Sequence, residues 1–297
     1  MTILKVAKQP LRSILSNRQK ERIGFPPHNE TYRGNGSFRG QICITNRRYV
    51  QITVMKKRIL VIGDIHGALR ALKQVLERAA ITEQDTLVFL GDYVDGWSES
   101  KQVIDHLIHL DETYSCLFVR GNHDTWCANW LHNGEAPEKW LKHGGAATVE
   151  SYASVSAEDK AKHLEFFSRM QHYYIDGNKR LFIHAGFSSM HGPEEEVYAS
   201  NYSWDRTLWE MALTMDKRVK KDSVLYPKRL KLFSEIFIGH TPTIYYNVDI
   251  PMNGVNVWNV DTGAAFTGKL SVMDIESKTF WQSDVVQTLY PGEKGRN

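Results

Sequence analysis

An aspartate and a histidine two residues apart, Asp64 and His66, are the first side chains in this sequence that suggest metal-binding chemistry. They follow the apolar run Ile59–Ile62 and are flanked by Gly63 and Gly67, a composition typical of a tight turn between a strand and a helix. A carboxylate and an imidazole at one strand end can point into the same cleft. Alone, the pair is only a weak indication of a metal site.

Four further motifs of the same kind follow, each after an apolar run typical of a buried strand. They are Gly91-Asp-Tyr-Val-Asp95, Gly121-Asn-His-Asp124, His184-Ala-Gly186 and Gly239-His-Thr-Pro242. Five strand ends therefore present six oxygen or nitrogen ligands: Asp64, His66, Asp92, Asn122, His184 and His240. A lone Asp or His at such a place is usually a cap or a turn residue, but five successive occurrences favour a metal centre.

The types of these ligands indicate which metal they hold. Carboxylate, amide and imidazole groups without a thiolate favour manganese, iron, zinc or a related divalent ion over calcium. Six ligands suit two ions about 3.5–4 Å apart that share one carboxylate, and Asp92 is the expected shared ligand. Such a pair activates water for attack on a phosphate ester. We expect manganese to support activity in vitro, with iron and zinc as alternatives.

The elements that position these ligands alternate regularly along the chain. Strands are expected at 58–63, 86–90 and 115–119, with helices near 68–80 and 125–131 and another capped by Ser98 or Ser100. Three successive strand–motif–helix units predict parallel strands whose carboxyl ends meet at one edge. A helix near 158–170 and strands at 180–183, 235–238, 255–260, 270–275 and 279–281 complete the predicted pattern.

Composition excludes several classes of protein. The chain has 297 residues, of which 42% are hydrophobic, which is enough for one large domain or two small ones. No apolar run reaches the length of a membrane span. The three cysteines show no spacing typical of zinc sites or disulfide frameworks. These features predict a cytoplasmic protein with no membrane partner, and they leave the oligomeric state open.

Basic charge is concentrated in residues 1–54, which hold ten Lys or Arg residues and two acids, against 27 and 32 in the remainder. Because no basic stripe remains beyond residue 54, we expect no nucleic-acid binding. Residues 1–54 are predicted to be a basic, flexible extension. Three interpretations stay open: an appended tail, an organelle-targeting segment, or sequence upstream of a true start at Met55. Residues 55–290 are predicted to form the catalytic domain.

In combination, the motifs resemble those of the calcineurin-like metallophosphoesterases. More narrowly they are similar to the bacterial and phage serine/threonine protein phosphatases, a group that includes the symmetrical diadenosine tetraphosphate hydrolases. The resemblance covers about residues 57–276 and includes Arg120-Gly-Asn-His-Asp124 and Asn259-Val-Asp-Thr-Gly-Ala264. It implies an α/β fold with α+β character, the four-layer αββα sandwich of the metallo-dependent phosphatases, in which two mixed sheets pack face to face between helices.

The resemblance also implies roles for the individual residues. One ion would be held by Asp64, His66 and Asp92, and the other by Asp92, Asn122, His184 and His240. His123 would protonate the leaving alkoxide, oriented by Asp95, which agrees with the chemistry because histidine exchanges protons near neutral pH.

One position departs from the family pattern. The protein phosphatases usually carry an arginine directly after the second Asp of the middle motif, and here that position is Gly96. The guanidinium that would grip the substrate phosphate is therefore missing. The next residue, Trp97, is either a flat wall for an aromatic or nucleobase-bearing substrate or a cover for the core. We therefore expect weaker phosphate binding and a substrate that need not be a phosphoprotein.

Three other residues are candidates for substrate contact. Arg206, in Trp204-Asp-Arg206, resembles the family's second phosphate-binding arginine, with a surface salt bridge as the alternative. Arg120 either braces its loop or touches phosphate. Asn122 would contact the substrate as well as the metal.

The expected function is hydrolysis of phosphate monoesters by metal-bound hydroxide, in the manner of a serine/threonine protein phosphatase. The alternative is hydrolysis of dinucleoside tetraphosphates or other nucleotides, which the missing guanidinium and the tryptophans at 97, 126, 130 and 140 favour. A catalytically degenerate binding module is a third interpretation, but the retained Asp95 and His123 argue against it. The partner is thus a phosphorylated protein or a small phosphorylated molecule.

Overall fold

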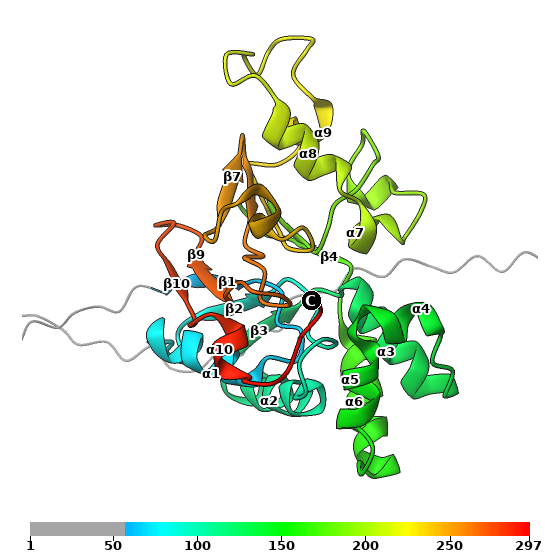
Figure 1. Cartoon of the computed structure of the whole chain (residues 1–297). Helices are drawn as coiled ribbons and strands as arrows, with labels where there is room; N and C mark the ends of the chain where they lie inside the picture. Colours follow the sequence, from blue (N-terminus) through cyan, green and yellow to red (C-terminus); the bar gives the residue numbers. More distant parts are fainter. Residues whose placement is uncertain (1–56) are drawn as a thin grey trace, which may run out of the picture. The chain divides into compact units, whose positions relative to one another are not determined.

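Two mixed five-stranded sheets form the centre of the protein, for which a computed structural model describes residues 57–297 (Figure 1). In the first sheet β1, β2 and β3 run parallel, and β9 pairs antiparallel with both β1 and β10. Its strands in spatial order are β10 (Phe280–Gln282), β9 (Ser271–Asp274), β1 (Ile59–Ile62), β2 (Thr86–Phe89) and β3 (Ser115–Phe118). The predicted extension at 1–54 lies outside the described residues.

The second sheet repeats this plan with other strands. Here β5, β6 and β8 run parallel, and the edge strands β4 and β7 are antiparallel to their neighbours. The spatial order is β4 (Tyr173–Ile175), β5 (Arg180–Ile183), β6 (Glu235–Ile238), β8 (Val257–Asn259) and β7 (Met252–Gly254). The motif-bearing strands β5 and β6 are therefore parallel neighbours, as β1, β2 and β3 are in the first sheet.

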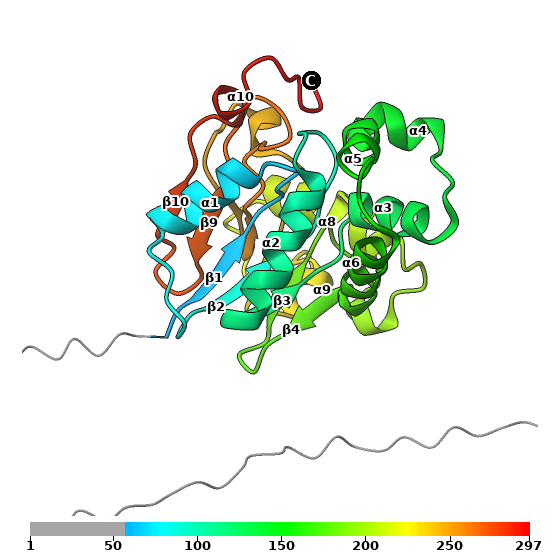
Figure 2. The same ribbon diagram turned by 90° about the horizontal axis from the view of Figure 1, so that it is seen from below.

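The apolar core is divided into separate layers, because successive side chains of each strand point to opposite faces of the sheet. In β1, Leu60 and Ile62 pack against helices, whereas Val61 belongs to a cluster that also holds Phe182 and Phe237 of the other sheet. Each sheet thus has one face against the other sheet and one against helices. This confirms the predicted four-layer architecture, which the two views show from different sides (Figure 2).

Helices cover the outer face of each sheet. Those packed with the first sheet's core are α1 (Leu69–Arg78), α2 (Ser100–Thr113), α3 (Asn122–Asn133), α4 (Glu138–Trp140), α5 (Ala146–Ser151), α6 (Ala157–Arg169) and α10 (Val286–Leu289). Those packed with the second are α7 (Asn201–Trp204), α8 (Thr207–Thr214) and α9 (Lys228–Lys231). A π-helical turn at Leu141–Gly145 and 3-10 turns at Pro193–Glu195 and Thr243–Tyr246 complete the elements.

The predicted elements recur with small shifts, the edge strands β4 and β7 were not predicted, and two further details differ. Helix α3 begins at Asn122, so the Asn-His-Asp motif forms its first turn rather than the loop before it. The predicted serine cap of α2 is wrong, because Glu99 precedes the helix and the Ser100 hydroxyl instead accepts a hydrogen bond from the Asp95 amide. No helix within residues 57–297 is both long and apolar enough to cross a bilayer.

Candidate active site

The six predicted ligands lie together, where the carboxyl ends of strands from both sheets meet. All are buried, with exposed fractions between 0% and 7%: Asp64, His66, Asp92, Asn122, His184 and His240. Two groups have ligand atoms within 4.8 Å of one another, and Asp92 belongs to both. The first group also contains His66 and His123, and the second contains His184 and His240.

Asp92 occupies the centre of the site. Its Oδ2 lies 3.7 Å from His66 Nε2 and 3.3 Å from His184 Nε2, so one carboxylate oxygen faces both groups. Its Oδ1 accepts a 2.9 Å hydrogen bond from the His123 amide. A Cβ at Gly121 would collide with this carboxylate, which explains why the motif after β3 begins with glycine. The position of Asp92 is the one that a shared ligand requires.

Asp124, which the sequence reasoning did not assign, locks the loops after β2 and β3 together. Its carboxylate accepts hydrogen bonds from the backbone amides of Asp92 at 2.8 Å, Tyr93 at 2.9 Å and Gly121 at 2.8 Å. Two loops that belong to different strands are thereby held by one buried side chain. The signal for it was available, since Asp124 is the last residue of the Gly-Asn-His-Asp motif.

Hydrogen bonds to backbone carbonyls orient two of the imidazoles. His66 Nδ1 lies 3.1 and 3.0 Å from the carbonyl oxygens of Val94 and Asp95, and His184 Nδ1 lies 2.8 Å from that of Leu90. Because a carbonyl only accepts, each Nδ1 carries a proton, which leaves Nε2 as the nitrogen that faces the site. Metal-binding histidines are typically fixed in this way.

Three buried atoms at the site have no hydrogen-bond partner: Asn122 Oδ1, His184 Nε2 and His240 Nε2. His184 Nε2 faces Asp92 but without the geometry of a hydrogen bond. Leaving such a group unpaired costs about 1–3 kcal/mol. With Asp92 they are the ligand set that the family resemblance gives to the second ion. Their lone pairs converge without a donor, so these residues fit a divalent cation.

The charges of the buried side chains also favour a bound cation at this site. Burial, and then the charge of Asp261, raise the pKa of Asp64 well above its usual range. Burial and repulsion from Asp92 raise the pKa of Asp124 to about 7, and burial raises that of Asp261 to about 6. Burial disfavours a charge on His184, but Asp92 and Asp64 raise its pKa to about 10. Such concentrated negative charge is what bound cations neutralise.

Four residues of the site have a strained backbone, among nine non-glycine residues with positive φ in the described part of the chain. His66, Asp92, Asp95 and His240 have φ values of +53°, +54°, +75° and +66°, in the left-handed region that residues with a Cβ seldom adopt. Each such residue costs on the order of 1–3 kcal/mol and persists only where the surrounding structure holds it. Strain of this kind is typical of functional sites.

His123 and Asp95 form a buried pair. His123 Nδ1 lies 2.6 Å from Asp95 Oδ2, and both side chains are at most 2% exposed. Trp140 Nε1 donates to the same carboxylate at 2.6 Å, and Thr148 Oγ1 donates at 2.6 Å. The sequence indicates Trp140 only as a possible aromatic contact and gives no role to Thr148, because neither lies near Asp95 in the chain.

The predicted substrate-binding residues have different surroundings. Arg206 Nη1 donates to Thr241 Oγ1 at 2.7 Å and to the His240 carbonyl at 3.3 Å, so its guanidinium lies beside the second group rather than against a carboxylate. The Arg120 guanidinium instead donates to the carbonyl of Phe167. For Arg120 the structure agrees with the loop-bracing interpretation.

Trp97 does not form a wall for the substrate. Its side chain is 0% exposed, its Nε1 donates to the Ala264 carbonyl at 2.8 Å, and it stacks on Tyr290 at 5.2 Å between ring centroids. The core-covering alternative therefore describes Trp97. The aromatic rim of the site comes from Trp126, whose ring lies 5.1 Å from that of His123, and from Trp204, which is 42% exposed.

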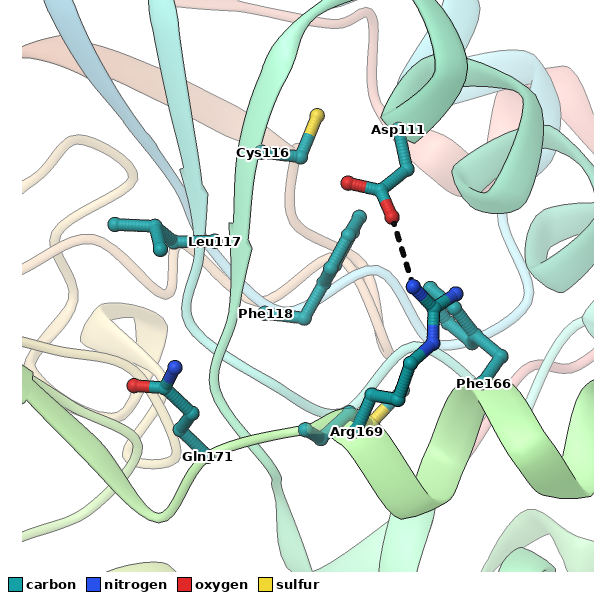
Figure 3. Close-up of a pocket in the computed structure, with 8 residues that line it drawn as sticks. Asp111, Cys116, Leu117, Phe118, Phe166, Arg169 and Gln171 are labelled. Carbon is teal, nitrogen blue, oxygen red and sulfur yellow. Dashed lines mark hydrogen bonds and ion pairs between the residues drawn. The ribbon is translucent and has the colours of Figure 1, made fainter. Parts of the chain in front are cut away.

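A hollow beside β3 is a separate feature of the surface (Figure 3). Asp111 and Arg169 form an ion pair of 3.4 Å within it, and its other lining residues include Cys116 and Gln171. The predicted ligands and the His123–Asp95 pair are not among the residues that line this hollow.

The fold and the site define a calcineurin-like phosphoesterase, and the chain belongs to that family, whose model matches residues 57–265. The asymmetrical bis(5'-nucleosyl)-tetraphosphatase PrpE of Oceanobacillus iheyensis is 26% identical over 238 residues, 75% of this chain and 90% of that protein. PrpE of Anoxybacillus flavithermus is 25% identical over 72% of this chain and 88% of its own length.

A crystal structure provides a comparison of the fold. The protein, provisionally assigned as a diadenosine tetraphosphatase, matches with a TM-score of 0.51 at 17% identity, over 77% of this chain and 94% of its own. At this identity the similarity concerns the fold alone. From its family and curated relatives, the chain is a metal-dependent phosphoric ester hydrolase.

Proposed function

We propose that this protein hydrolyses phosphate monoesters at a site for two divalent ions. One ion would be held by Asp64, His66 and Asp92, and the other by Asp92, Asn122, His184 and His240. The observation that carries the proposal is the position of Asp92, whose Oδ2 lies between the Nε2 atoms of His66 and His184. When bound, two such ions lower the pKa of a water molecule and hold the phosphoryl oxygens.

The protein's own part in the reaction includes delivery of a proton to the leaving group. Asp95 holds the Nδ1–H of His123 at 2.6 Å, so the opposite nitrogen, Nε2, is the one that can serve the substrate. An alkoxide leaves readily only when it is protonated, and a positioned histidine typically contributes about 10²–10⁴-fold to the rate. Trp140 and Thr148 keep the Asp95 carboxylate in place. His123 is thus proposed as the general acid.

The proposal is tested by metal titration of the purified protein with para-nitrophenyl phosphate as substrate. We expect turnover that depends on manganese and rises to a plateau near two ions per chain, measured by elemental analysis after desalting. Replacing Asp92 with Asn should abolish turnover and lower the metal content. A metal-loaded wild-type protein that hydrolyses neither para-nitrophenyl phosphate nor a phosphopeptide would refute the proposal, and turnover of diadenosine tetraphosphate alone would favour the second candidate below.

A nucleotide substrate is the second candidate, and the aromatic rim favours it. Trp204 is 42% exposed, and its ring lies 5.2 Å from that of Trp126 and 6.0 Å from that of His240. An exposed indole beside the metal ligands offers a stacking surface for a nucleobase, worth about 1–3 kcal/mol per base. The curated relatives are named as bis(5'-nucleosyl)-tetraphosphatases, which agrees with this candidate.

Comparing substrates for the Trp204→Ala variant separates the two candidates. If a nucleobase stacks on Trp204, kcat/KM for diadenosine tetraphosphate should fall about tenfold or more, while kcat/KM for a phosphoserine peptide stays within about twofold. Equal effects on both substrates would remove the support that the rim gives to the nucleotide candidate.

A further inference from the structure

The last residues of the chain pack against the loop that carries Asp95. The Glu293 carboxylate accepts hydrogen bonds from the Ser98 amide at 3.0 Å and from the Ser98 hydroxyl at 2.8 Å. The Arg296 amide donates to the Ala265 carbonyl at 2.9 Å. Figures 1 and 2 mark the end of the chain beyond α10, and Figure 2 shows it at the edge of the molecule. The predicted domain end at residue 290 therefore leaves out residues that contact the site loop.

Two glycines make room for the side chain of Arg296. Gly96 and Gly144 have φ values of +114° and +105°, and their loops are joined by a 3.1 Å hydrogen bond from the Gly96 amide to the Gly144 carbonyl. A Cβ on either glycine would lie only 3.1 Å from Arg296 Cγ. The aliphatic stem of Arg296 thus runs through a slot that larger residues would narrow. Gly96 is the position where the family's protein phosphatases usually carry arginine.

The guanidinium at the end of this stem lies beside the proposed metal ligands. Arg296 Nη1 is 3.4 Å from His66 Nε2, and the group lies over the Phe266 ring at 5.3 Å from its centroid. Its Nε is buried and has no hydrogen-bond partner. Among residues 57–297, no carboxylate forms an ion pair with it.

The charge of Arg296 acts on Asp261, whose pKa it lowers against the effect of burial, but the unused Nε donor leaves the half-buried guanidinium able to bind a further anion. Phosphate oxygens match its planar fork, which can form two parallel charge-assisted hydrogen bonds. The substrate anion that the proposed function brings to this place is a phosphoryl group. The charge of Arg296 is therefore complementary to the phosphoryl group that the proposed reaction would bring.

We propose that Arg296 is a substrate-binding residue, brought by the chain's end through the slot at Gly96 and Gly144 to grip the phosphoryl group beside His66. The inference rests on the proposed function, because it is that reaction which places a phosphoryl group there. In this proposal Arg296, near the C-terminus of the chain, supplies the guanidinium that is missing at position 96.

The test compares Arg296→Gln, which keeps most of the stem but loses the charge, with Arg296→Lys and with Lys294→Ala as a matched control on the exposed part of the same tail. KM and kcat are measured with para-nitrophenyl phosphate at saturating manganese. The inhibition constant of inorganic phosphate and the metal content are measured as well. Phosphate binding is also followed without turnover, as the rise in melting temperature on adding phosphate.

We expect Arg296→Gln to raise KM and the phosphate inhibition constant by about ten- to a hundredfold, with unchanged metal content. Its phosphate-induced rise in melting temperature should be smaller, Arg296→Lys should recover only part of the loss, and Lys294→Ala should match the wild type. Wild-type phosphate affinity in Arg296→Gln would overturn the inference, and so would faster turnover, which would mark the tail as inhibitory. An inactive wild type would instead refute the proposed function.

Discussion

Replacing His123 with Asn distinguishes its two interpretations most sharply. The ligand atoms of His123, His66 and Asp92 lie within 4.8 Å of one another, so geometry alone would let His123 bind metal. Its Nδ1 is held 2.6 Å from Asp95, however, and its backbone amide donates to Asp92 at 2.9 Å. These contacts favour a proton donor placed beside the ions. His123→Asn keeps a polar group of smaller size but cannot act as an acid near neutral pH.

The expected size of the effect depends on the leaving group. For a phosphoserine peptide, whose alkoxide needs a proton, kcat should fall about 10²–10⁴-fold, which corresponds to about 2.7–5.4 kcal/mol in activation free energy. For para-nitrophenyl phosphate the fall should be much smaller, because nitrophenolate leaves without protonation. Metal content should stay at the wild-type value.

A second histidine provides the control. His163 is also buried, and its Nε2 lies 2.9 Å from Asp105 outside the site. His163→Asn therefore reports the general cost of removing a buried histidine that faces an aspartate. It should leave the ratio of the kcat values for the two substrates unchanged. If His123→Asn loses metal, or if it slows both substrates equally, the assignment of His123 as the general acid is refuted.

Three further predictions concern stability and metal binding. Asp124→Ala leaves three backbone amides without their acceptor, so the free energy of unfolding in urea should fall by about 3 kcal/mol or more, and a loss below about 1 kcal/mol would contradict the locking role. Burial opposes ionisation of Glu196, but hydrogen bonds from the amides of Ser188 and neighbouring residues hold the pKa of Glu196 at about 2. The ionised carboxylate therefore stabilises the folded state, and this stabilisation should vanish as the pH falls from about 4.5 towards 2. Glu196→Gln should lack that acid-dependent loss when unfolding is measured across this range. Manganese at a hundred times its Kd should raise the free energy of unfolding by about 2.7 kcal/mol per site, and a chelator should remove the gain; no change in thermal scans would argue against a metal site.

The sequence was sufficient to predict which side chains gather at the proposed metal site, because each one sits in a short local motif. Asp64 and His66 follow β1 within four residues, and the turn chemistry around them is visible in the chain itself. Parallel strands then bring such motifs to one edge without any further information. For this reason the position of Asp92 between two groups could be anticipated, whereas the two-sheet fold was implied by the family resemblance of the motifs.

The supporting residues could not be predicted because they reach the site through tertiary packing. Trp140 and Thr148 lie 45 and 53 positions from Asp95, and Arg296 lies 230 positions from His66. Nothing in their local sequence marks them as partners of the site. The short edge strands β4 and β7, of three residues each, were missed for a related reason, because pairing with a neighbour rather than internal pattern defines them.

For the same reason, the sequence could not decide whether Trp97 faces the substrate or covers the core. Its neighbours in the sequence are polar, and segments from far along the chain cover it, including Tyr290, which stacks on its ring, and Ala264, whose carbonyl accepts from its Nε1. A sequence pattern shows that a residue is large and flat, but it does not show which remote segment covers it.

The central claim is that Asp92 is shared by two ions, and a crystal structure of the manganese-loaded protein with anomalous diffraction tests it most directly. We predict two anomalous peaks per chain, about 3.5–4 Å apart, with the Asp92 carboxylate between them. His66 and His184 should lie on opposite sides of the pair. A single peak, or two peaks of which only one contacts Asp92, would contradict the claim.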